Sequence, residues 1–201
     1  MKRIFALIFA AFLTVSAFSS CGKEELTVEQ AIEIAGPLIQ KSYEVNDIFF
    51  GEGLPHEEDT AAEEDASQYD VAPVRYLRVI SDKYNSVSSL KEAALEVYTE
   101  SYMENIFDRV FNGVSGDDDQ VIEYARYFES FSENLKIRAG VEKESIVTGR
   151  KYDVTTLKIT SQAGGYVFFT VESFIDGEPA GTVELSMKDE GNGWRLDSPT
   201  Y

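Results

Sequence analysis

The 201-residue sequence has very few of the side chains on which most catalytic and metal sites depend. It contains one cysteine, Cys21, and one histidine, His56. A Ser-His-Asp or Cys-His set needs a histidine beside its nucleophile, and structural zinc needs clustered cysteine and histidine. Neither a G-x-G-x-x-G nor a G-x-x-x-x-G-K-[ST] motif occurs. We therefore predict no catalytic residue, no metal site and no cofactor.

Basic side chains are also scarce, since 18 Lys and Arg stand against 36 Asp and Glu, for a formal net charge of −18. Phosphate groups would repel such a surface, which argues against nucleic acid and anionic lipid as partners. The acidity favours a basic protein or a cationic ligand, or it serves solubility alone. A pair of carboxylates that performs acid–base chemistry cannot be singled out among so many, so that alternative stays open.

Long apolar runs are absent except at the start of the chain. Lys2 and Arg3 form a short basic start, residues 4–15 are nearly all apolar, and small polar residues follow. This is the pattern of a secretory signal, and its apolar part is too short for a membrane span. The sequence "FSSC" (Phe18 to Cys21) resembles the end of a bacterial lipoprotein signal, with Phe18 where leucine is usual.

That resemblance implies that residues 1–20 are a signal peptide and that Cys21 becomes lipidated. Residues 21–26 would then form a tether, and residues 27–201 a single domain at the outer face of a bacterial membrane. The lipid anchor alone would hold the protein there. The alternative is an ordinary secretory signal followed by an unpaired cysteine.

Two capping boxes predict the first helices. Thr27 to Gln30 forms the first, and apolar residues then recur at helical spacing to about Val45. Gly36-Pro37 should kink or split this helix. Ser89 to Glu92 forms the second box and predicts one helix from Leu90 to about Asn112, with its aromatic stripe in the core.

Residues 51–72 hold eight acidic residues and no Lys or Arg. Like charges and a lack of bulky apolar residues leave little to bury, so we expect a mobile insertion. It is either a solvated loop or an interaction surface for a partner or a cation. The candidate interaction residues are Glu57, Glu58, Asp59, Glu63, Glu64 and Asp65.

The remaining segments read mainly as strands. Residues 72–80 alternate, with Val74, Tyr76, Arg78 and Ile80 on one side of the strand. Residues 113–119 form a turn, because the D-x-D-x-D-G spacing of a calcium loop is absent. Residues 121–130 fit a helix or a strand, and we favour a hairpin with a strand at 135–141. Further strands are expected at 145–148, 152–161, 166–175, 181–188 and 194–196, with glycine turns between the long ones.

Early helices and late antiparallel strands predict an α+β domain, with the N-terminal helices packed on a curved sheet. This order of elements resembles the nuclear-transport-factor-2-like (cystatin-like) superfamily, in which helices close one side of a cone-like sheet. The resemblance implies a pocket within the cone. Trp194 and Tyr201, near the end of the chain, are candidates for its mouth, although a tryptophan that closes a last strand also suits the core.

A closer resemblance rests on "SLKEAALEVYTESYMENIF" (Ser89 to Phe107) and "GWRLDSPTY" (Gly193 to Tyr201). These segments resemble lipoproteins of anaerobic Gram-positive bacteria that are similar to the IseA-like inhibitors of cell-wall DL-endopeptidases. The resemblance implies a non-enzymatic domain that blocks a peptidoglycan hydrolase at the cell envelope, and it identifies no inhibitory residue. Two alternatives remain: a small-molecule binding module with an aromatic-lined cone, and a hydrolase or isomerase that uses a buried carboxylate of raised pKa.

Overall fold

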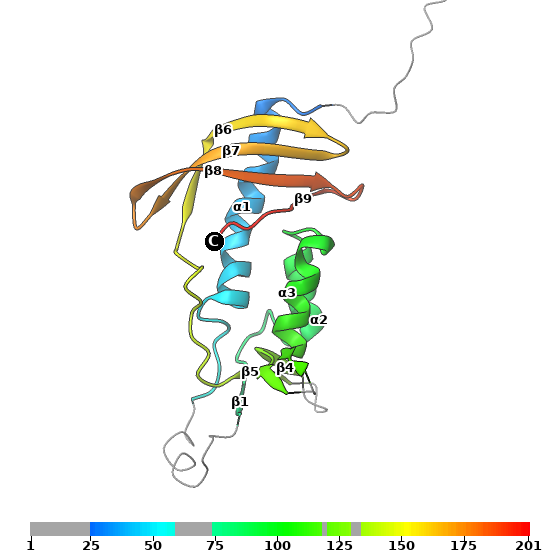
Figure 1. Cartoon of the computed structure of the whole chain (residues 1–201), viewed down its shortest axis with the longest axis vertical. Coiled ribbons are helices and arrows are strands. Elements are labelled where there is room, and N and C mark those ends of the chain that lie inside the picture. The colour runs from blue at the N-terminus through cyan, green and yellow to red at the C-terminus, as the bar shows by residue number, and fades with distance from the viewer. Residues whose placement is uncertain (1–24, 59–73, 118–119, 130–133) are drawn as a thin grey trace, which may run out of the picture.

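The computed structural model describes residues 25–58, 74–117, 120–129 and 134–201. Within these ranges the fold is α+β: helices lie against antiparallel sheets that do not close into a barrel (Figure 1). The predicted fold class is therefore confirmed. The predicted signal peptide and Cys21 lie outside the described residues. No helix in the described ranges is both long enough and apolar enough to cross a membrane.

The first helix, α1 (Val28–Phe50), begins at the predicted capping box. The backbone N–H of Gln30 donates to the Thr27 hydroxyl at 3.3 Å, and the Gln30 side-chain oxygen accepts from the Thr27 N–H at 2.8 Å. The helix then continues through Pro37, so of the predicted kink or split at Gly36-Pro37 the split is wrong.

The predicted end of α1 near Val45 is also wrong, because the helix runs five residues further to Phe50. Ile48, Phe49 and Phe50 are all buried in the common core. Most helical stability in proteins comes from packing of an apolar face. Tertiary contacts in the last turn therefore extend the helix beyond the point that its local pattern indicates.

The predicted single helix over 90–112 is instead two helices, α2 (Val87–Leu95) and α3 (Glu100–Asn112). The capping box of α2 consists of Ser86 and Ser89, so the predicted box at Ser89 lies three residues too late. At the break, the Thr99 N–H donates to the Leu196 carbonyl at 2.9 Å. A contact with the C-terminal strand thus replaces the helical hydrogen bond, and no local pattern reveals it.

The main sheet has the order β6-β7-β8-β9 and is antiparallel throughout. Its strands agree with the predicted ones, and glycines occupy the turns between them. The predicted strand at 145–148 is wrong, since the Val147 N–H donates to the Glu144 carbonyl at 3.0 Å and the chain turns there. The strands are β6 (Lys151–Ala163), β7 (Tyr166–Ile175), β8 (Glu178–Asp189) and β9 (Trp194–Leu196).

A small sheet lies beside the other end of α1, with the order β1-β5-β4 (Figure 1). The favoured hairpin is confirmed, because β4 pairs with β5 in antiparallel fashion. A separate two-stranded ribbon, β2 with β3, includes part of the segment predicted as a turn at 113–119. These strands are β1 (Tyr76–Arg78), β2 (Val114–Ser115), β3 (Val121–Glu123), β4 (Tyr127–Glu129) and β5 (Leu135–Arg138).

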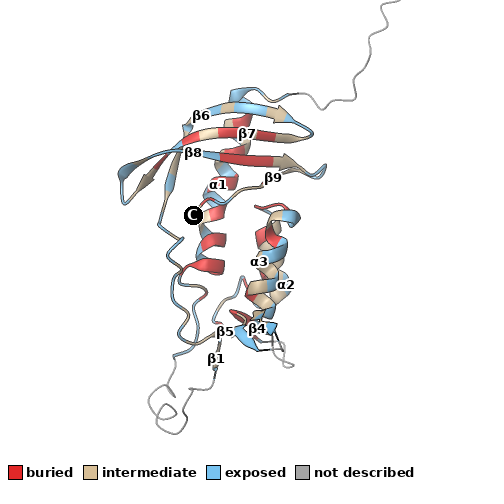
Figure 2. Cartoon of the chain, viewed as in Figure 1, coloured by how far each residue is buried: buried red, intermediate tan, exposed pale blue. Residues whose placement is uncertain are grey.

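The core lies between α1 and the main sheet and continues beneath the small sheet. Figure 2 shows buried stretches on β7 and β8 and along α1. Buried side chains of α1 and of the main sheet pack together there. They include Ala31, Ala35 and Ile39 from α1 and Leu157, Val167, Phe169, Leu185 and Met187 from the sheet.

Candidate binding site

The two ends of the domain differ in the side chains that they expose. The described chain enters at the main-sheet end, and α1 carries it to the small sheet at the opposite end (Figure 1). Of the eight exposed large hydrophobic residues in the described ranges, six belong to the small-sheet end. We call these six the distal surface: Val74, Ile80, Val121, Ile122, Tyr124 and Phe128.

Strand register explains why apolar side chains face outward there. Tyr127 pairs with Ile137 across the small sheet, and both side chains are buried beneath it. Phe128, the next residue, therefore faces away from the core and is 46% exposed. The predicted alternation of residues 74–80 is borne out, since Val79 is buried whereas Val74 and Ile80 are exposed.

Hydrogen bonds fix the connection between β3 and β4 against this sheet. The Tyr76 hydroxyl donates to the Ala125 carbonyl at 2.8 Å, and burial raises the pKa of Tyr76. Arg138 Nη1 donates to the Tyr124 carbonyl, and the rings of Tyr76 and Phe128 lie 5.7 Å apart between centroids. These contacts hold the part of the distal surface that carries Tyr124 and Phe128 in place before any partner binds, which lowers the entropic cost of binding.

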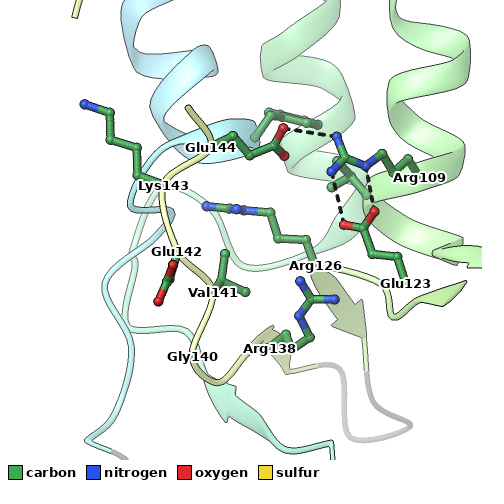
Figure 3. A pocket seen from close by; sticks show the side chains of 11 residues that line it. Arg109, Glu123, Arg126, Arg138, Gly140, Val141, Glu142, Lys143 and Glu144 are labelled. Carbon is green, nitrogen blue, oxygen red and sulfur yellow. Dashed lines mark hydrogen bonds and ion pairs between the residues drawn. The ribbon is translucent and has the colours of Figure 1, made fainter. Parts of the chain in front are cut away.

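A charged pocket of about 390 Å³ opens beside the distal surface, where the end of α1 meets α3 and the segment 140–144 (Figure 3). In a chain of net charge −18, four basic side chains line it. They are Arg109, Arg126, Arg138 and Lys143, and the acidic lining residues are Glu123, Glu142 and Glu144.

Arg109 is neutralised by two of these acids. Its Nε and Nη2 donate to the carboxylate of Glu123 at 2.9 and 3.2 Å, and its Nη1 donates to Glu144 at 3.2 Å. The hydrogen bonds to Glu123 raise the pKa of Arg109. This pair of contacts ties α3 to β3 and to the segment that forms the opposite wall (Figure 3).

Arg126 is bound differently, by backbone carbonyls. Its side chain is buried, with Nε donating to the Ile48 carbonyl at 3.1 Å and Nη2 to the Gly51 carbonyl at 2.5 Å. Both acceptors belong to the C-terminal end of α1, where the helix dipole is negative. The last turn of α1 has no basic residue of its own, so Arg126 supplies the complementary charge.

A second pocket, of about 240 Å³, borders the C-terminal residues. Tyr201 lines it, and its ring lies 5.0 Å from that of Phe50. Trp194 does not line this pocket; it pairs with Asp189 on β8 and packs partly buried against the core. Tyr201 therefore lines a pocket that Trp194 does not reach, and the two residues do not share one pocket mouth.

A buried polar network lies next to this second pocket. The Tyr98 hydroxyl donates to the Asn46 side-chain oxygen at 2.8 Å and lies 2.7 Å from the Thr200 hydroxyl. Thr200 in turn donates to the Ser42 hydroxyl at 2.6 Å. Burial raises the pKa of Tyr98 to about 12. The network joins α1, the α2–α3 break and the C-terminal residues.

The predicted acidic interaction residues are only partly described. Glu57 forms an ion pair with Arg78 at 2.5 Å, and its N–H donates to the Arg78 carbonyl at 2.9 Å. Glu58 is exposed. Asp59, Glu63, Glu64 and Asp65 lie outside the described residues. The described chain stops after Glu58 and resumes at Val74, so the acidic insertion joins the domain next to the distal surface.

The charged pocket was not predicted from the sequence. Arg126 lies among aromatic residues in "VIEYARYFES", which only weakly indicates that its side chain is buried. Its burial depends on the end of α1, which is distant in the sequence. In the described part of the chain, no group of three or more His, Cys, Asp or Glu is placed to hold a metal ion. The chain matches no protein-family model, and a search of curated proteins finds no match.

Proposed function

We propose that the protein is a non-enzymatic, lipid-anchored binding protein of the bacterial cell envelope that docks onto another protein through its distal surface. The observation that carries this proposal is the concentration of exposed apolar side chains at the small-sheet end. Exposed apolar side chains gathered at one end of a molecule favour a site of protein contact there. An anchor at Cys21 would enter the domain at the main-sheet end and leave the distal surface pointing outward.

In its most specific form, the proposal makes the partner a cell-wall DL-endopeptidase that the protein inhibits. The two segments that carry the resemblance to IseA-like inhibitors pack against each other. The Thr99 N–H donates to the Leu196 carbonyl at 2.9 Å, and the Thr99 hydroxyl donates to Asp197. This contact supports treating the two segments as one structural unit.

Charge further defines the expected partner. The acidic insertion joins the domain at Glu58 and Val74, next to the distal surface, and Glu57 pairs there with Arg78. We expect the partner to present an apolar patch flanked by Lys or Arg, because opposite potentials steer association and suppress wrong partners.

The test removes exposed apolar side chains from the distal surface and measures binding to purified DL-endopeptidases of the same organism. Phe128→Ser and Ile80→Ser alter residues that are 46% and 56% exposed, so we expect the fold to persist. Each should weaken binding and inhibition at least about tenfold, as loss of a central apolar contact does. The matched control is Val28→Ser, which is 39% exposed at the main-sheet end.

Two outcomes would contradict the proposal. If the purified protein neither binds nor slows any DL-endopeptidase of that organism, the inhibitor form is wrong. If Val28→Ser weakens binding as much as Phe128→Ser does, the distal surface is not the contact.

A further inference from the structure

We infer that the charged pocket beside the end of α1 binds the oxyanion group of a ligand, a carboxylate or a phosphate, through Arg126 and Arg138. This site lies next to the distal surface, but the inference does not depend on the docking proposal. It rests on how the charges of the pocket are paired.

Arg126 is a buried cation without a carboxylate partner. Its side chain is 6% exposed, and no Asp or Glu in the described residues forms an ion pair with it. A guanidinium has five N–H donors, and the bonds to Ile48 and Gly51 use only its Nε and one position on Nη2. The Tyr127 side chain also interacts with the guanidinium, but no carboxylate of the described residues accepts from the remaining donors. The negative end of the α1 dipole offsets part of this charge, but a buried cation usually also has an anionic partner, and the described residues supply none.

Arg138 places a second cation in the same pocket. Its backbone N–H donates to the Arg126 carbonyl at 2.8 Å, which makes the two arginines neighbours. Arg138 Nη1 donates to the Tyr124 carbonyl, and no carboxylate of the described residues pairs with its guanidinium. Two like charges that share one cavity repel each other, and a bound anion would remove that repulsion.

The acids of the pocket do not fill this role. Glu123 and Glu144 are engaged with Arg109 on one wall. Figure 3 shows Glu142 and Lys143 directed away from the interior, whereas the Arg126 guanidinium extends across it and that of Arg138 lies nearby. The positive charge that faces the interior without a carboxylate therefore belongs to Arg126 and Arg138.

The bonds to α1 orient Arg126 for this task. The carbonyls of Ile48 and Gly51 hold one edge of the planar guanidinium and leave the rest of it for the cavity. A guanidinium fixed in this way binds carboxylate or phosphate oxygens at low entropic cost. The cavity of about 390 Å³ has room for several groups the size of a water molecule, each of which occupies roughly 30 Å³.

The test titrates the purified chain with sodium acetate and, separately, with sodium phosphate at constant ionic strength. Backbone amide NMR signals of Arg138, Gly140 and Val141 report on the pocket, and we expect their shifts to saturate. Arg138→Gln should weaken binding at least about tenfold, as loss of a charged hydrogen bond does. Lys151→Gln is the control, because it removes the same charge from the second pocket. Arg126 is kept, since it also holds the end of α1.

Saturable binding of acetate supports a carboxylate ligand, and saturable binding of phosphate supports a phosphate ligand. The inference is overturned if neither anion gives a saturable shift, or if Lys151→Gln weakens binding as much as Arg138→Gln does. Either result leaves the docking proposal standing, because no partner protein enters the experiment.

Discussion

Gly113 illustrates how a single residue decides a local path. It follows α3 with φ 79° and ψ −168°, a combination that is essentially restricted to glycine. A Cβ at this position would lie 2.4 Å from the Glu123 carbonyl oxygen. The tight approach directs the chain from α3 into β2 and places β3, with Glu123, opposite Arg109.

We expect Gly113→Ala to lower the free energy of unfolding by about 2 kcal/mol or more, because backbone strain and a steric clash act together. Urea denaturation followed by circular dichroism measures the loss. Gly177→Ala is the control, since its φ is 84° but a Cβ there meets no atom within 4 Å. That variant should lose about 1 kcal/mol. Equal losses in the two variants would show that the contact with Glu123 contributes nothing.

At the scale of elements, Thr99 separates α2 from α3. The residue is fully buried, and its hydroxyl accepts a hydrogen bond from the Tyr102 N–H at 3.2 Å as the N-cap of α3. The hydroxyl also donates to Asp197 at the end of β9. The cap and the strand contact therefore act at one residue, which couples the helix break to the C-terminal strand.

Thr99→Ala should destabilise the protein by about 1–2 kcal/mol relative to Thr99→Ser, because it removes the cap and leaves the Asp197 carboxylate without this donor. Thr99→Ser keeps the hydroxyl and loses only a methyl group. Thermal and urea unfolding of both variants provide the measurement. If the two variants are equally stable, the Thr99 hydroxyl does not stabilise the break between α2 and α3.

At the scale of the whole molecule, the network around Tyr98 joins three distant parts of the chain. Asn46 comes from α1, Tyr98 precedes α3, and Thr200 lies next to the last residue of the sequence. The Tyr98 side chain is 1% exposed, and burial raises its pKa to about 12. An ionised tyrosine at this position would carry a desolvated charge in the core.

The raised pKa predicts a loss of stability at alkaline pH. Below pH 10 the Tyr98 hydroxyl is protonated in both states, so its contribution is fully present. Between pH 10 and about 12 the unfolded chain ionises first and binds fewer protons, so stability falls by about 2–3 kcal/mol.

Urea unfolding at pH 9, 10, 11 and 12 measures this loss. Tyr98→Phe should show a shallower decline over that interval, although its stability at pH 9 is lower because the Asn46 and Thr200 hydrogen bonds are gone. Tyr124→Phe, at an exposed position, should keep the full decline. A decline that is the same in Tyr98→Phe and the unaltered protein would assign the effect to other groups.

Local sequence patterns were sufficient for the capped start of α1, for the long strands of the main sheet and for the outward side of β1. Capping boxes, glycine turns and two-residue alternation depend only on neighbours in the chain. The true end of α1, the break at Thr99 and the burial of Arg126 were decided by tertiary structure. In each case the decisive partner is remote in sequence: the core around Phe49, the Leu196 carbonyl, and the carbonyls of Ile48 and Gly51. The charged pocket forms only because folding brings the end of α1, α3 and the segment 140–144 together, and no local sequence pattern predicts this contact.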